Sequence, residues 1–198
     1  MADLSKTTAN QQSLRKATMV YPQPIAIASG QVLRSRSPQE RVDACLKAGE
    51  VIARYVAALA LASFRAREVA DHPEEQAIEP LVGTLSFGHF LGIVQRVAGL
   101  PSNHPLAPYL SPFRKKRRGD RGVADDGLVA LLELRNDLGH GLARLSEARA
   151  KNILTEQDPE SRLVQALDSL EGILSCPLFL IEEQRLERGQ ILAHRLWL

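Results

Sequence analysis

The stretch LLELRNDLGHG, residues 131–141, contains an arginine whose position in a leucine-rich segment needs a chemical explanation. Arg135 follows Leu128 by seven residues, so a helix here would place its guanidinium on the face that carries the leucines. A charge on an apolar face is costly unless it is paired. Arg135 therefore requires a carboxylate, a ring of carbonyl groups or a phosphate as its partner, and the first of these would be a purely structural ion pair with another helix.

His140 follows Arg135 by five residues and lies between two glycines. A helix that ends at Gly139 would let the imidazole turn back toward the guanidinium. Asn136 could then hydrogen-bond either a substrate or the imidazole ring. The alternative for His140 is a capping role, in which it interacts with the helix dipole at the carboxyl end.

A second charged feature is the run RKKRRGDR, residues 114–121. Such a run favours polyanions by counterion release and carries no base specificity. It directly precedes the segment with Arg135 and could line the approach to it, or it could be a solvated loop. Its six cations are Arg114, Lys115, Lys116, Arg117, Arg118 and Arg121.

Apolar spacing predicts an all-α fold, an up-and-down bundle of four main helices within residues 37–176. The first helix has a clear start, since Ser37, Pro38 and Glu40 form a capping box with proline at the first helical position. The others are expected near residues 86–98, 125–138 and 158–176. The third of these carries Arg135, so the bundle must position the candidate site.

The segments outside this body have a different composition. Residues 1–19 are rich in Ser, Thr, Gln and Asn and are expected to form a disordered tail. Residues 20–36, with two prolines and a glycine, are expected to form an extended arm. Residues 177–198 are predicted to form a short β-hairpin or an amphipathic helix, and they could begin a further domain.

Composition excludes several classes of protein. The chain has 198 residues, 44% of them hydrophobic, and a net charge of +2, too small to make the whole surface bind nucleic acid. Cys45 and Cys176 belong to no metal-binding or disulfide pattern, so no metal is expected. Phosphate-loop and dinucleotide motifs are absent from the sequence, so no cofactor is expected. No signal peptide or membrane span is recognised, which favours a cytoplasmic protein.

The motif LLELRNDLGHG in the third helix of such a bundle resembles the signature of the HEPN superfamily, over roughly residues 37–176. The resemblance implies a metal-independent endoribonuclease that acts as a homodimer, with one composite site made by two motifs. Arg135 would bind the scissile phosphate, His140 would transfer protons and Asn136 would orient the site. Attack by the ribose 2′-hydroxyl would leave a 2′,3′-cyclic phosphate. RNA, a second copy and further domains or a regulatory protein are the implied partners, in a bacterial defence or toxin system.

Two other functions fit the same residues. The chain could be a non-catalytic helical module for dimerisation or partner docking within a larger protein, with the basic run as a contact surface. It could also be a nucleic-acid adaptor that depends on residues 114–121 alone.

Overall fold

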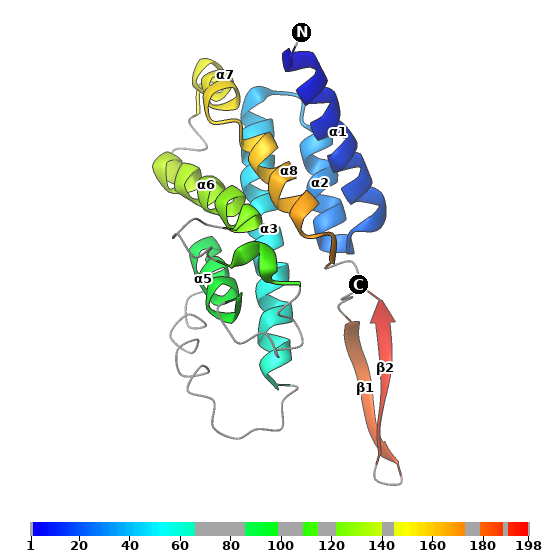
Figure 1. Ribbon diagram of the computed structural model, residues 1–198. Coiled ribbons are helices and arrows are strands. Elements are labelled where there is room, and N and C mark those ends of the chain that lie inside the picture. Colours follow the sequence, from blue (N-terminus) through cyan, green and yellow to red (C-terminus); the bar gives the residue numbers. More distant parts are fainter. Residues whose placement is uncertain are drawn as a thin grey trace.

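The computed structural model describes residues 2–65, 86–98, 109–114, 122–139, 145–172, 179–187 and 190–197 (Figure 1). Up to residue 172 the regular elements in these ranges are all helical, which confirms the all-α class of the body. They are α1 (Ala2–Val20), α2 (Gln23–Arg34), α3 (Pro38–Arg65), α5 (Phe87–Ala98), the 3₁₀ turn η1 (Ser111–Phe113), α6 (Val123–Leu138), α7 (Glu147–Glu156) and α8 (Pro159–Ser169).

The long helix α3 is the centre of the helical body, and α2, α5, α6, α7 and α8 all contact it (Figure 1). Its predicted start is confirmed, because the Glu40 amide donates to Ser37 Oγ at 3.2 Å and the Ser37 amide donates to Glu40 Oε2 at 3.4 Å. The apolar side chains of one face of α3 are buried, at Val42, Cys45, Leu46, Ile52 and Val56. Helix α3 therefore provides the surface on which the other helices position their side chains.

The prediction of a disordered tail over residues 1–19 is wrong, because this segment forms helix α1 and packs against α2 and α8. Leu14 and Ala17 are fully buried. Helix α1 also makes polar contacts: Asn10 donates to Ser161 at 2.9 Å, and Lys16 pairs with Glu171 at 2.7 Å. Composition was misleading here because some of these polar side chains are used in packing: Asn10 and Ser13 hydrogen-bond Ser161 and Asp168 of α8.

The extended arm predicted for residues 20–36 is also wrong, since Gln23–Arg34 is helix α2. Pro22 is the N-cap and Pro24 lies in the first turn, where a helix needs no backbone N–H donor. Ile25 and Val32 face the core. Between α1 and α2, the buried Tyr21 hydroxyl donates to the Leu167 carbonyl of α8 at 2.5 Å, which ties the amino-terminal helices to the rest of the body.

Helix α6, which carries Arg135, begins close to its predicted start, with Asp125 and Asp126 in the first turn. It packs closely on α8 at Gly127, where a Cβ atom would lie 2.5 Å from the Arg162 carbonyl oxygen. Helix α8 begins as predicted, with Asp158 accepting from the Ser161 amide at 3.1 Å. The position of α6, and so of Arg135, depends on this close packing.

The carboxyl-terminal segment contains two strands, β1 (Phe179–Glu187) and β2 (Gln190–Trp197). They pair antiparallel as a hairpin, with Phe179 opposite Trp197 and an irregularity between Ile181 and Glu183. In the part of the chain that is described, no helix has both the length and the apolar character needed to cross a bilayer.

Candidate functional site

The end of α6 holds the two described residues of the candidate motif, Arg135 and Asn136. Gly139 ends the helix, as predicted, with a φ of +49° that favours glycine. Its amide donates to the carbonyl groups of Arg135 and Asn136. Asn136 is exposed, and His140 lies outside the described residues. The structure therefore places Arg135 and Asn136 in the last turn of α6, next to the C-cap Gly139.

The guanidinium of Arg135 has a carboxylate partner on another helix, because its Nη1 donates to Glu50 Oε2 of α3. The side chain of Arg135 is 39% exposed, whereas that of Glu50 is 17% exposed. Arg135 therefore lies at the edge of the leucine face, beside the buried Leu131 and Leu138, and not within it. Of the three partners considered, the structure shows the carboxylate.

Glu50 binds a second arginine that the motif did not indicate. Arg54 Nη2 lies 3.1 Å from Glu50 Oε1, and its side chain is 60% exposed. We call Glu50, Arg54 and Arg135 the arginine cluster. It carries a net charge of +1 at neutral pH. The spacing of four residues between Glu50 and Arg54 could have revealed their pairing from the sequence, but not their contact with α6.

Helix α5 completes the surroundings of the arginine cluster. The Cζ atom of Arg54 lies 5.1 Å from the ring centroid of Phe90, which is almost fully buried. Gly49, next to Glu50, lets α3, α5 and α6 meet, since a Cβ there would lie 2.8 Å from Leu131 and 3.3 Å from Phe87. The cluster thus lies where three helices converge.

The basic run is described only at its first residue. Arg114 is partly buried, and its Nε donates to the Ala98 carbonyl at the end of α5 at 2.9 Å. This cation therefore connects the 3₁₀ turn to α5, and its role in binding nucleic acid stays a prediction. The remaining cations, Lys115, Lys116, Arg117, Arg118 and Arg121, lie outside the described residues.

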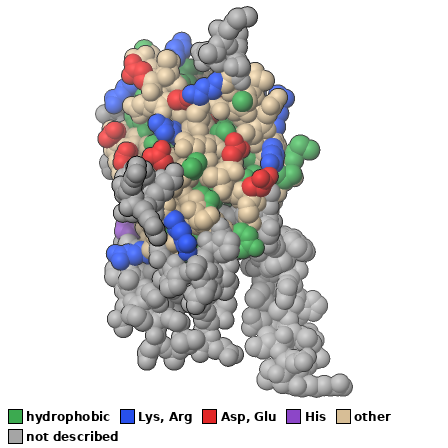
Figure 2. All heavy atoms as spheres, in the orientation of Figure 1, with side chains coloured by type: hydrophobic (Ala, Val, Ile, Leu, Met, Phe, Trp, Pro, Cys, Tyr) green, Lys and Arg blue, Asp and Glu red, His purple; other side chains and the backbone are tan. Residues whose placement is uncertain are grey.

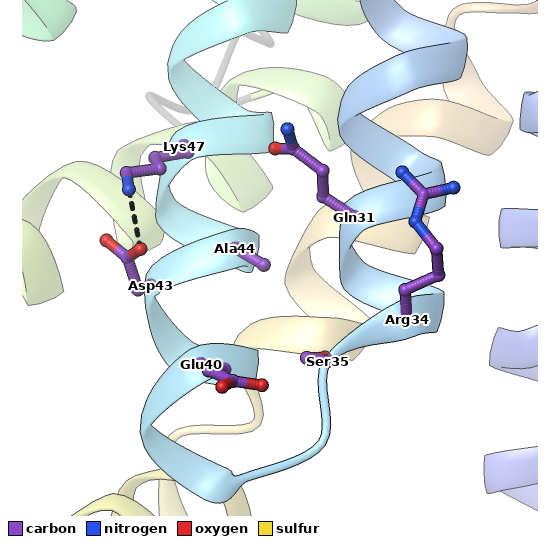
Figure 3. Close-up of a pocket in the computed structure, with 7 residues that line it drawn as sticks. All are labelled: Gln31, Arg34, Ser35, Glu40, Asp43, Ala44 and Lys47. Atoms are coloured by element: carbon purple, nitrogen blue, oxygen red, sulfur yellow. Dashed lines mark ion pairs between the residues drawn. The ribbon is translucent and has the colours of Figure 1, made fainter.

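Charge on the described surface is mixed. On the face in Figure 2, the blue Lys and Arg side chains alternate with red Asp and Glu side chains and form no single basic patch among the coloured residues. A groove of about 300 Å³ between α2 and α3 shows the same mixture (Figure 3). Its lining residues are Gln31, Arg34, Ser35, Glu40, Asp43, Ala44 and Lys47.

Three of the four charged groups of that groove, Glu40, Asp43 and Lys47, are engaged in structural contacts. Asp43 pairs with Lys47 at 2.7 Å, and Glu40 Oε2 accepts from the Arg36 amide at 2.7 Å as part of the helix start. The groove therefore has less excess charge to attract a ligand than the arginine cluster, in which one carboxylate is shared by two cations.

Two other reactive side chains in the described part of the chain are Cys45 and His89. Burial raises the pKa of the Cys45 thiol to about 12, so it is a poor nucleophile at neutral pH. His89 contacts Ser86 through Nδ1 at 2.6 Å, at the start of α5. Among the described residues, no three His, Cys, Asp or Glu side chains gather in a way that could hold a metal ion.

Comparison with protein-family models, with curated proteins and with solved structures found no match to this chain.

Proposed function

We propose that this chain is a HEPN-type, metal-independent endoribonuclease domain that acts as a homodimer. In this proposal the helical body is the up-and-down bundle of the superfamily, and the ends of α6 from two copies meet to make one site. Further domains or a regulatory protein would control the activity, in the setting of a bacterial defence or toxin system.

The observation that carries the proposal is that Arg135, at the end of α6, is partly exposed and has guanidinium N–H donors left unused in the described part of the chain. Only Nη1 of its guanidinium has a hydrogen-bond partner among the described residues, and that partner is Glu50. A guanidinium has five N–H donors, so an oriented and partly exposed arginine with unused donors suits a phosphate ligand. Asn136 is exposed on the same turn, and Gly139 ends the helix one residue before His140 in the sequence.

The chemistry follows from these residue types. The 2′-hydroxyl oxygen attacks the adjacent phosphorus, the bond from phosphorus to the 5′-oxygen breaks, and the products are a 2′,3′-cyclic phosphate and a 5′-hydroxyl. His140 removes the proton of the attacking hydroxyl or supplies one to the leaving oxygen, as a histidine can near neutral pH. Arg135 stabilises the charge that develops on the phosphoryl oxygens, and Asn136 orients the reacting groups.

A docking module is the second candidate, and the Glu50–Arg135 ion pair favours it. An arginine whose charge is balanced by a partly buried carboxylate has a structural explanation that requires no substrate. In this alternative the exposed end of α6 mediates dimerisation or binds a partner protein.

The two candidates differ in how Arg135→Ala and His140→Ala behave. An endoribonuclease loses RNA cleavage in both variants while its helical circular dichroism and its dimer remain. A docking module loses assembly in at least one of them and shows no cleavage as wild type. A nucleic-acid adaptor tolerates both substitutions but loses RNA binding when residues 115–118 are neutralised.

A further inference from the structure

The two guanidinium groups of the arginine cluster lie on different oxygens of one carboxylate. Arg54 contacts Glu50 Oε1 and Arg135 contacts Glu50 Oε2, so Glu50 holds the two cations next to each other. Each arginine uses one nitrogen in these contacts and has no other hydrogen bond among the described residues. One negative charge between two positive ones leaves a net attraction for an anion together with free N–H donors.

Arg54 is held more firmly than its exposure alone would suggest. Its guanidinium lies over the ring of the buried Phe90, and a cation over an aromatic face is attracted to it. The other cations paired at the same spacing within a described helix are Lys47 with Asp43 and Lys151 with Glu147. In the described part of the chain, neither has a second cation on its carboxylate or a contact with an aromatic ring. Arg54 is therefore more than an ordinary surface ion pair.

From this geometry we infer that Arg54 is a second phosphate-binding residue, which contacts the RNA backbone phosphate next to the one bound by Arg135. The inference rests on the proposed function, because that function supplies RNA as the polyanion. A planar guanidinium with two parallel donors matches two phosphate oxygens, and the ring beneath Arg54 reduces the conformational freedom lost on binding. Arg54 lies on α3 and Arg135 on α6, so one strand would bind across the junction of the two helices.

The test measures binding separately from cleavage. A fluorescent oligonucleotide with 2′-deoxyribose at every position has the same phosphates but no 2′-hydroxyl to attack. Its affinity for the full chain is measured by fluorescence anisotropy over a series of salt concentrations. Loss of one phosphate contact lowers the slope of log affinity against log salt by about 0.7, which corresponds to an affinity about fivefold weaker at 0.1 M salt. We expect this change for Arg54→Gln.

The matched control is Lys151→Gln. Lys151 is an exposed cation on α7 that pairs with Glu147 four residues earlier, just as Arg54 pairs with Glu50. Both substitutions remove one positive charge, so an effect of net charge alone weakens binding equally in the two variants. Circular dichroism and thermal unfolding of both variants establish that the fold is retained, and Arg54→Lys gives a second variant that keeps the charge.

Failure of this inference is distinguishable from failure of the proposed function. If Arg54→Gln binds the deoxy-oligonucleotide as Lys151→Gln does, or if wild type does not bind it at 0.05 M salt, the inference is overturned whether or not RNA is cleaved. If Arg54→Gln binds selectively more weakly while wild type cleaves no RNA, the phosphate site stands and the nuclease proposal fails. An Arg54→Lys variant that binds more tightly than Arg54→Gln supports the phosphate contact.

Discussion

The close packing of α6 on α8 at Gly127 predicts a specific cost for Gly127→Ala. A Cβ atom at this position would lie 2.5 Å from the Arg162 carbonyl oxygen and 3.5 Å from the Ala166 nitrogen. Ordinary contacts begin near 3.5 Å, so the two backbones would have to separate by about 1 Å. The clashing Arg162 oxygen belongs to a helix backbone, which cannot rotate away as a side chain can.

The expected magnitude combines two opposing effects. Overpacking of this kind costs about 1–3 kcal/mol, whereas replacing glycine by alanine inside a helix gains about 1 kcal/mol. The net expectation is a loss of about 1 kcal/mol in the free energy of unfolding. With a denaturant dependence of about 2 kcal/mol per molar urea, the midpoint of urea unfolding falls by about 0.5 M.

The matched control is Gly88→Ala. Its Cβ would lie 3.6 Å from Leu132 Cδ2, which is an ordinary contact with a flexible side chain. Its urea midpoint should therefore stay unchanged or rise. If Gly127→Ala is at least as stable as Gly88→Ala, the described packing of α6 on α8 is wrong, and so is the position of Arg135 that depends on it.

Three further predictions follow from single contacts. Burial, together with the nearby negative charges of α8 and the turn after it, raises the pKa of Tyr21 from 10.0 to about 12. The protonated hydroxyl therefore stabilises the fold fully below pH 10, and this stabilisation is lost as the pH rises toward 12. Tyr21→Phe should lower the free energy of unfolding by about 1 kcal/mol at pH 8 and flatten its decline between pH 10 and 12, measured by urea unfolding. Ser37→Ala removes the side-chain cap of α3 and should cost about 1 kcal/mol in the same assay, and a cost no greater than that of an exposed serine elsewhere would contradict the capping geometry. Glu50→Gln removes the negative charge between two arginines, so it should tighten deoxy-oligonucleotide binding at low salt. The same substitution should lower the kcat of RNA cleavage, because Glu50 orients Arg135. Unchanged values of both would show that Glu50 does not hold these cations in place.

The sequence predicted the helices whose signals are local. Ser37 with Glu40 marks the start of α3, Asp158 marks the start of α8, and Gly139 marks the end of α6, because capping involves residues close together in the chain. The amino-terminal helices were missed because their stability comes from distant residues. Asn10, Tyr21 and Lys16 find their partners about 150 residues later, on or just after α8.

In the candidate site too, local signals can be read from the sequence, whereas contacts between distant residues cannot. The leucine spacing correctly indicated that Arg135 needs a partner, but Glu50 is 85 residues away in sequence, and nothing local distinguishes it from other glutamates. The only local signal at Arg54 is its spacing of four residues from Glu50. Its relation to Phe90 and Arg135 appears when α3, α5 and α6 are brought together.

The proposed activity of this chain is cleavage of RNA through attack by the 2′-hydroxyl. The most direct measurement incubates the purified chain with an end-labelled oligoribonucleotide in excess EDTA and identifies the new ends, with His140→Ala prepared in parallel to exclude a contaminating nuclease. The proposal predicts 2′,3′-cyclic phosphate and 5′-hydroxyl ends that are absent with the variant. Intact RNA with a folded wild-type dimer, or products that end in a 3′-hydroxyl, would contradict it.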